Sequence, residues 1–256
     1  MKLWIFLLLA TLLSGQSYAI EMMQFRVAAQ ESSEPKFIAA THNGKSAITG
    51  LCVDIFRAIE KADPIIQFTG DQAWQPRARI DNNLKSGALD VICGVQHIER
   101  FEAIYAFIDT PLFTVNYLLA ARADDSVEIN SWDDIRKLGK DGIILAMHGF
   151  GIVDILEDLG GLTIDSGGTT PLSNLKKLLA GRGRFYCHRS PGIKTDILKA
   201  GMGNKVRLIS KLQFSEKLYM ATSKYVPNSD RLRIRAALNI LQANGELKRL
   251  MDKYQE

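Results

Sequence analysis

Residues 74–113 read WQPRARIDNNLKSGALDVICGVQHIERFEAIYAFIDTPLF and say most about how this chain folds. They join a predicted helix at 78–85, ended by Ser86-Gly87, to a short apolar strand at 91–94 and a loop that carries Arg100. An arginine beside a strand end suits the capture of a small anion, because its planar fork holds a carboxylate through two charge-assisted hydrogen bonds. The segment therefore predicts a binding protein rather than an enzyme.

Strands and helices alternate along the rest of the chain, which predicts an α/β fold with mainly parallel sheets. The predicted strands are 25–29, 65–68, 91–94, 143–146, 185–188 and 218–222, with an extended apolar stretch at 117–122. Other predicted helices follow Gly50, Ser131, Gly151 and Thr170, and two apolar faces at helical spacing cover 234–241 and 247–254. Ser131 with Asp134 forms a capping box, and Thr170-Pro171 is a favourable N-cap and first helical position.

Composition also suggests where the chain crosses between lobes. The extended apolar stretch at 117–122 turns polar at 123–130, and we place a return crossing near 210–216. These crossings predict a first lobe built from 20–118 and 215–256, and a second lobe built from 119–214.

The first 19 residues have the pattern of a signal peptide. Lys2 precedes an apolar run at 3–13, and Ser17-Tyr18-Ala19 is a small-x-small cleavage site. An uncleaved membrane anchor is the alternative, but the run is too short to span a bilayer comfortably. No cysteine follows it at a lipidation position, so we expect cleavage after Ala19 and a soluble exported protein.

Charge and motifs exclude several classes of function. The formal net charge is +4, and it falls to +3 when Lys2 leaves with the signal peptide. The basic residues are scattered, which disfavours a nucleic-acid partner. The histidines lack ligand spacing, no H-E-x-x-H occurs, and no glycine cluster continues as a phosphate loop, so we predict neither metal nor cofactor. An S-x-x-K match at 173–176 lacks the companion motifs of acyl-transfer enzymes and is interpreted as solvated surface.

Three cysteines in an oxidising compartment leave the pairing open. One disulfide with one remaining thiol is possible, and so are three buried thiols, because cysteine behaves as a small hydrophobe. Cys52 and Cys93 should share a lobe and form the favoured pair, which leaves Cys187 free. The chain has no C-x-x-C motif to support redox catalysis or a structural zinc site.

Several short motifs, in order, resemble the periplasmic solute-binding proteins of the polar amino-acid uptake type (family 3). They are GLCVD at 50–54, LKSGALDVI at 84–92, HIER at 97–100, TPLF at 110–113, LLAGR at 178–182, and the ending from Asn244-Gly245 to Lys253-Tyr254. Trp74 and Arg77, before the L-x-x-G-x-x-D segment, resemble a divergent branch of that family. The resemblance implies a two-lobed periplasmic-binding-protein-like fold of type II, with two mixed sheets joined by two crossover strands and a ligand cleft between the lobes.

The resemblance also implies roles for individual residues. Arg100 matches the arginine that grips a ligand carboxylate, and His97 stands where the family carries a threonine. Gly149-Phe150-Gly151 stands where a Gly-Thr segment supplies donors. Arg189 falls where an acid commonly holds the ammonium of an amino acid. Either the ligand is not an ordinary α-amino acid, or another acid such as Glu34 or Asp109 replaces it, or the alignment is shifted.

Each of these residues also has a simpler interpretation. Arg100 could form a surface salt bridge with Glu99 or Glu102, and such pairs contribute little. Core packing is the default for an aromatic residue. We expect ligand contact for Arg100, assistance from Arg77 and Arg189, and cleft walls that include aromatic residues. The candidate ligand-binding set is Arg100, Arg77, Trp74, Arg189, Phe150, His97, Phe113 and Gly149.

We therefore expect a monomeric periplasmic protein that binds a small polar, carboxylate-bearing solute for an ABC-type permease. One alternative is a dehydratase of the cyclohexadienyl dehydratase type on the same fold, for which Glu34, His97 or His148 could supply the acid or base. Another is the ligand-binding partner of a membrane sensor. Three arginines that converge on a cleft would suggest a ligand with more than one anionic group, because unpaired buried cations are costly.

Overall fold

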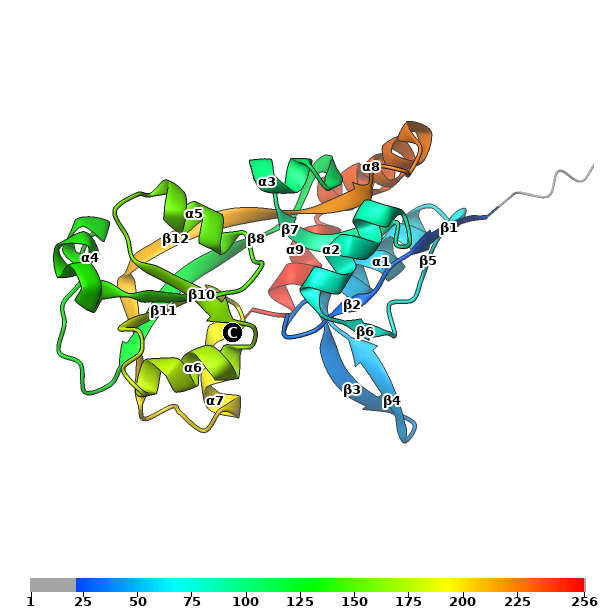
Figure 1. Cartoon of the computed structure of the whole chain (residues 1–256). Coiled ribbons are helices and arrows are strands. Elements are labelled where there is room, and N and C mark those ends of the chain that lie inside the picture. Colours follow the sequence, from blue (N-terminus) through cyan, green and yellow to red (C-terminus); the bar gives the residue numbers. More distant parts are fainter. Residues whose placement is uncertain (1–21, 256) are drawn as a thin grey trace, which may run out of the picture.

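The computed structural model describes residues 22–255, so the signal peptide predicted at 1–19 lies outside the described residues. Figure 1 shows two groups of elements joined by two long strands, β8 (Tyr105–Arg122) and β12 (Val206–Ser223). We call the group at the right of Figure 1 lobe 1 and the group at the left lobe 2. No helix in the described range 22–255 combines the length and hydrophobicity needed to cross a membrane.

Lobe 1 holds both ends of the described chain. Its strands are β1 (Met23–Arg26), β2 (Ala29–Gln30), β3 (Ile38–His42), β4 (Lys45–Thr49), β5 (Ile66–Thr69), β6 (Trp74–Gln75) and β7 (Val91–Gln96). Its helices are α1 (Leu51–Ala62), α2 (Arg77–Ser86), α3 (Glu99–Glu102), α8 (Asn228–Ala243) and α9 (Glu246–Asp252). The apolar face of α1 packs in the main core, as its helical spacing predicts.

Lobe 2 contains the elements between the two long strands. They are α4 (Trp132–Leu138), a 3₁₀ turn (Gly139–Gly142), β9 (Ile144–Met147), α5 (Ile152–Asp158), β10 (Ile164–Gly168), α6 (Pro171–Leu179), β11 (Phe185–Ser190) and α7 (Ile193–Lys199). Both predicted caps are confirmed: Ser131 and Asp134 form a capping box at α4, and Thr170 caps α6 with Pro171 at the first turn.

The α/β prediction is confirmed, but the expected predominance of parallel pairing is wrong, because β8 pairs antiparallel with both β11 and β12, and β12 pairs antiparallel with β7. A six-stranded mixed sheet has the order β10-β9-β11-β8-β12-β7, so it continues from lobe 2 into lobe 1. Three two-stranded pairs, β1-β5, β2-β6 and β3-β4, complete the described sheets, in place of a second large one. The boundaries predicted at 118/119 and 214/215 fall inside β8 and β12.

The long strands were only partly predicted, because Pro111 interrupts the apolar alternation of β8. Pro111 cannot donate to the strand ladder, and the register with β12 shifts on either side of its partner Tyr219. The β3-β4 hairpin was not predicted, although Asn43 and Gly44 both have positive φ, as a two-residue type I′ turn requires.

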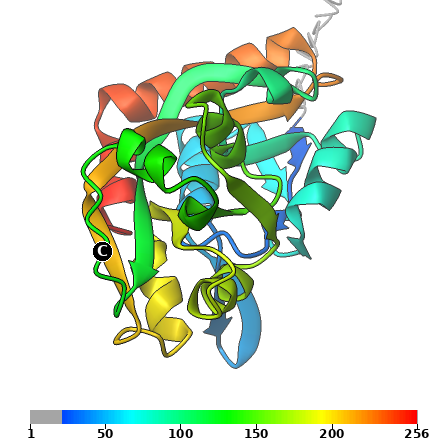
Figure 2. The ribbon, with the colours of Figure 1, turned by 60° about the vertical axis from the view of Figure 1, so that its left-hand side comes forward.

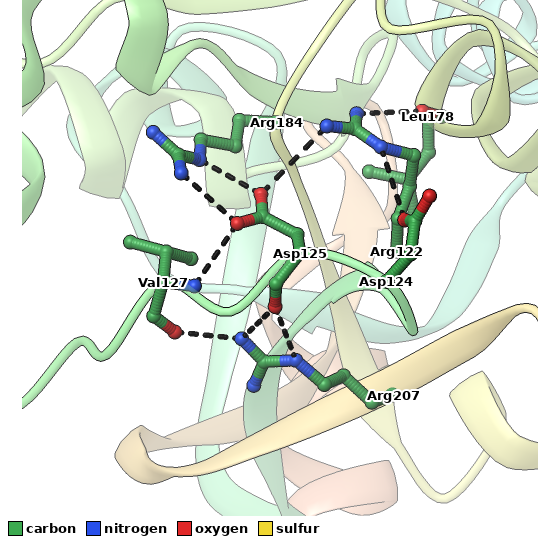
Figure 3. Close-up of polar contacts among 7 residues, drawn as sticks. All are labelled: Arg122, Asp124, Asp125, Val127, Leu178, Arg184 and Arg207. Atoms are coloured by element: carbon green, nitrogen blue, oxygen red, sulfur yellow. Dashed lines mark hydrogen bonds and ion pairs between the residues drawn. The ribbon is translucent and has the colours of Figure 1, made fainter.

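A polar network holds the loop after β8 at the outer end of lobe 2 (Figure 3). The carboxylate of Asp125 accepts hydrogen bonds from Arg184 Nε at 2.8 Å and Nη2 at 2.9 Å. Arg207 donates to the backbone carbonyls of Asp125 and Val127. The hydrogen bonds from Arg184 hold the pKa of Asp125 below its usual value. The polar segment at 123–130 is therefore an anchored connection.

Candidate ligand-binding site

A small cavity, which we call the inner cavity, lies between the two lobes on the six-stranded sheet. Its free volume is ≈ 10 Å³, enough for about one water molecule in this closed arrangement. Its lining residues are Lys36, Arg77, Gly94, Val95, Gln96, Tyr117, Phe150, Arg189 and Leu218. Lobe 1 contributes Lys36 and Arg77, and lobe 2 contributes Phe150 and Arg189.

Four adjacent strands supply the floor of the inner cavity. Gln96 of β7 is paired with Leu218 of β12, and Tyr117 of β8 is paired with Arg189 of β11. Since β7, β12, β8 and β11 are neighbours in that order, side chains distant in sequence stand side by side. Burial raises the pKa of the Tyr117 hydroxyl, which keeps it protonated as a hydrogen-bond donor.

Lys36 enters the inner cavity from the loop before β3, and it was not predicted. The side chain is 3% exposed, and its Nζ donates to Gln30 Oε1 at 2.9 Å and to the carbonyl oxygen of Gly94 at 3.0 Å. Gly94 has φ +72°, and a Cβ there would stand 2.7 Å from Lys36 Cδ, so only glycine leaves room for the lysine stem. Burial lowers the pKa of Lys36 well below its usual value, and the charges of Arg189 and Arg77 lower it further.

Arg77 is the first residue of α2 and is 9% exposed. Its Nε donates to Asp81 Oδ1 at 2.7 Å, one helical turn away, and its Nη2 donates to the Tyr105 hydroxyl at 3.1 Å. Its guanidinium also lies 4.7 Å from the centroid of the Phe101 ring. Pro76 is the N-cap of α2 and has an extended backbone, and the helix needs no N–H donor at that position. These contacts fix the guanidinium in one orientation.

Arg189 reaches the inner cavity from lobe 2 and is 3% exposed. Its Nη2 donates to the backbone carbonyl of Glu34 at 2.7 Å, across the interface between the lobes. Its guanidinium lies 5.7 Å from the centroid of the Phe150 ring. Among residues 22–255, Arg189 Nε and Gln96 Nε2 are buried without a hydrogen-bond partner. Buried donors of this kind are rare in folded proteins, and they mark a place where an acceptor would bind.

Two of the predicted residues lie near the inner cavity without lining it. A Cβ at Gly149 would be 4.0 Å from Arg77 Cγ, so the loop from 149 to 151 covers that arginine. Phe113 is buried in the core behind Gly94. A Cβ added at Gly94 would lie 3.1 Å from Phe113 Cζ. Phe113 therefore supports the cavity wall from the protein side.

The structure does not bring Arg100 and His97 to the inner cavity. Arg100 leaves α3 toward lobe 2, where its Nη2 donates to Asp154 Oδ2 of α5 at 2.7 Å, and its side chain is 47% exposed. His97 stacks on Phe107 at 4.0 Å between centroids and contacts Glu102. Arg100 thus bridges the lobes at their outer edge, paired with an acid that sequence reasoning did not consider.

A second, open cavity lies at the mouth of the cleft and includes Trp74. Its volume is ≈ 440 Å³, and the Trp74 side chain is 39% exposed. Lobe 1 lines it with Ser32, Glu34, Phe37, Ala39 and Trp74, and lobe 2 with Thr170, Pro171, Leu172, Asp196, Lys199 and Ala200. Figures 1 and 2 show the β3-β4 hairpin and helices α6 and α7 at this end of the molecule.

Neither acid considered as a replacement ammonium ligand lines the inner cavity. The Glu34 carboxylate pairs with Lys199 Nζ at 2.5 Å, at the mouth. The Asp109 side chain is exposed and lies 3.9 Å from Arg235. No group of acids, histidines and cysteines in the described part of the chain could hold a metal ion. Cys52 and Cys93, the favoured pair, are joined by a disulfide that ties the start of α1 to β7, and Cys187 is free and buried.

Comparison with known proteins identifies the fold. No protein-family model matches the sequence, and no curated protein sequence matches it either. Many solved structures share the fold. One is a histidine kinase sensor domain with similarity to periplasmic binding proteins, which aligns with a TM-score of 0.72 and 19% identity over 91% of this chain and 96% of that one.

Two other structures illustrate the range of proteins with this fold. The amino-acid ABC transporter substrate-binding protein AbpA of Streptococcus pneumoniae, bound to L-arginine, has a TM-score of 0.70 and 18% identity over 90% of this chain and 94% of its own. The ancestral amino-acid-binding protein AncCDT-1, a precursor of cyclohexadienyl dehydratase, has a TM-score of 0.69 and 18% identity over 91% and 95%. The chain therefore has the periplasmic-binding-protein fold.

Proposed function

From a chain with the periplasmic-binding-protein fold and a cationic cavity between its lobes, we propose a binding protein that captures a small polar, carboxylate-bearing solute and presents it to a membrane permease. One observation carries the proposal. Arg77 and Arg189 reach the inner cavity from different lobes, and both are buried. A solute held by both guanidiniums would join the lobes, as in hinge closure around a ligand. Since the inner cavity has room for about one water molecule, its lining side chains would have to move apart to admit that solute.

The expected affinity follows from these contacts. A hydrogen bond to a charged group contributes about 1.5–3 kcal/mol. Two such contacts supply about 3–6 kcal/mol. Micromolar binding corresponds to about −8 kcal/mol, so burial of the solute in a site that excludes water must supply the rest. In this proposal Arg189 and Arg77 are the residues that bind anionic groups of the solute, because Arg100 is already paired with Asp154.

The test is a thermal-shift screen of amino acids, dicarboxylates and aromatic acids, followed by calorimetry on the hits. Arg77→Ala and Arg189→Ala should each weaken binding about tenfold to a hundredfold, as the loss of about 1.5–3 kcal/mol implies. Arg79→Ala, on the exposed face of α2, and Arg182→Ala, exposed in lobe 2, are the matched controls and should change it less than about twofold. The proposal fails if no acid binds, or if the controls weaken binding as much as the cavity variants.

A catalytic role is the alternative, because a dehydratase precursor shares the fold. Such a reaction needs an acid or base beside the substrate. Glu34, His97 and His148 are not among the residues that line the inner cavity. We therefore propose binding without turnover. Conversion of prephenate-like acids by the purified protein would decide for the enzyme.

The bound solute could be passed to a transporter or reported to a membrane sensor. The fold occurs in a transporter substrate-binding protein and in a kinase sensor domain. We propose transport. Neighbouring permease and ATPase genes would support this choice, whereas a neighbouring receptor gene would favour sensing. N-terminal sequencing of the periplasmic protein tests export, with Ile20 as the expected first residue.

A further inference from the structure

The ammonium group of Lys36 occupies a set of oxygen acceptors at the wall of the inner cavity. Its Nζ lies 2.9 Å from Gln30 Oε1, 3.0 Å from the carbonyl oxygen of Gly94 and 3.5 Å from that of Cys93. An ammonium group has three donors and no acceptor, so it requires oxygens of this kind when it is buried. Here the acceptors are taken by a side chain of the protein.

The charges around the cavity are unbalanced. Arg77 has a carboxylate partner in Asp81, which also accepts a hydrogen bond from Tyr105. Within residues 22–255, neither Lys36 nor Arg189 forms an ion pair with a carboxylate. Lys36 and Arg189 therefore face the cavity without a carboxylate partner, and a bound anion would favour the charged form of Lys36, whose pKa is lowered by burial. Buried charges are normally paired, because desolvation disfavours an isolated one.

The remaining polar groups of the cavity also favour an anion. Gln96 Nε2 and Arg189 Nε are donors with no hydrogen-bond partner, and both side chains are at least nine-tenths buried. Neither aspartate nor glutamate lines the inner cavity. A solute cation placed there would meet like charges from three directions and no carboxylate.

We propose that the inner cavity selects a solute with two anionic groups and no ammonium group, because the protein supplies its own ammonium at Lys36. This inference rests on the proposed function and names the solute class for the same site. One anionic group of the solute would be held by Arg189 and the other by Lys36 with Arg77. Both groups are anionic hydrogen-bond acceptors, and either a dicarboxylate or a phosphorylated carboxylic acid supplies two of them.

Calorimetry on the unaltered protein tests the inference with matched solutes. Succinate and aspartate differ by one ammonium group. N-acetylaspartate has a neutral amide nitrogen at the position of the aspartate ammonium. Butyrate keeps the carbon chain of succinate with one carboxylate, and phosphoglycolate tests whether a phosphate can replace a carboxylate. We expect succinate or phosphoglycolate to bind at least about tenfold more tightly than aspartate and butyrate, because like charges and a missing partner both weaken binding.

The outcomes separate the inference from the function on which it rests. If aspartate equals or exceeds succinate while N-acetylaspartate binds less well, an ammonium group is recognised and the inference is overturned, although the protein still binds solutes. If butyrate equals succinate, the second anionic group is unnecessary and the inference is also overturned. If no carboxylate or phosphate solute binds, the proposed function fails and takes the inference with it.

Lys36→Met gives a second test. Methionine replaces the lysine stem as far as Cε and lacks the ammonium group, so the acceptors on Gln30 and Gly94 become available. We expect the preference for succinate over aspartate to shrink at least about tenfold, since the solute ammonium now has partners. An unchanged preference in a folded variant would overturn the role given to Lys36. If the variant does not fold, the comparison of solutes on the unaltered protein decides alone.

Discussion

Gly151 of lobe 2 lies close to Gln96 of lobe 1, and replacing it with alanine should hold the lobes apart. Its φ of −63° is ordinary, so alanine is conformationally acceptable and, without other contacts, would stabilise the protein by about 0.4–1 kcal/mol. A Cβ at this position would lie 2.4 Å from Gln96 Oε1, 3.0 Å from Gln96 Cδ and 3.2 Å from Gln96 Cβ. Rotation of the amide can relieve the first contact but not the last, because Gln96 Cβ is fixed to β7.

The size of the effect follows from these distances. Ordinary van der Waals contact begins at 3.4 Å, so the loop at 151 must move by up to 1.0 Å from the 2.4 Å contact. Overpacking of this kind costs about 1–3 kcal/mol. Because the cost falls on the closed form, solute affinity should weaken about 5- to 150-fold. We expect this loss in calorimetric titration with the tightest solute of the screen.

The control and the relief of the clash make the prediction specific. Gly203→Ala places a Cβ 3.4 Å from Leu198 Cδ2 on an exposed loop and should change affinity less than about twofold. Small-angle scattering of the solute-free protein should give a larger radius of gyration for Gly151→Ala, and the additional Gln96→Ala substitution should restore the original value. The reasoning is refuted if Gly151→Ala leaves both affinity and radius unchanged, or if the expansion persists without the Gln96 side chain.

Three further predictions concern the disulfide, the lobe 2 network and the outer ion pair. Replacing both Cys52 and Cys93 with serine should lower the free energy of unfolding, measured by urea titration, by about 2–4 kcal/mol, because the disulfide closes a loop of 41 residues. Equal stability of the parent and the variant under oxidising conditions would contradict this. Asp125→Asn should cost about 2 kcal/mol at pH 7, since it leaves the half-buried donors of Arg184 poorly paired. The pKa of Asp125 is lower in the folded protein than in the unfolded chain, where it is about 3.9. The carboxylate therefore stabilises the fold fully above the unfolded pKa, and this stabilisation is lost as the pH falls through the folded pKa. Urea unfolding of the parent and the variant should show a smaller difference in unfolding free energy at pH 3 than at pH 7. Arg100→Ala removes the half-exposed ion pair with Asp154 and should weaken solute binding less than about threefold, whereas Arg189→Ala should weaken it about tenfold or more. If calorimetry shows the larger loss for Arg100→Ala, Arg100 is the residue that binds the carboxylate.

Local patterns predicted much of the fold. The helices α1 and α2 and the strands β7, β9 and β11 lie within a few residues of their predicted ranges. Such elements show their burial through repeating apolar residues, which sequence reasoning can detect. The β3-β4 hairpin escaped because most of its residues are exposed or half-buried, so the apolar alternation is weak. There the Asn43-Gly44 turn was the only usable signal.

The candidate site was only partly predictable. Arg77, Phe150 and Arg189 were expected at the cleft, and the structure brings them together around one cavity. Lys36 carries no motif, and nothing in its neighbours along the chain marks it as buried. Arg100 does follow a buried strand, as expected, but α3 turns it outward to an acid of the other lobe.

The amino-acid sequence alone therefore determined the alternating elements, the helix caps and the presence of arginines near strand ends, because each depends on residues close together in the chain. The packing of two lobes decided which cations face one another, since Lys36, Arg77 and Arg189 come from separate elements and meet only in three dimensions. Their burial together is a property of the interface between the lobes, and no local pattern encodes it.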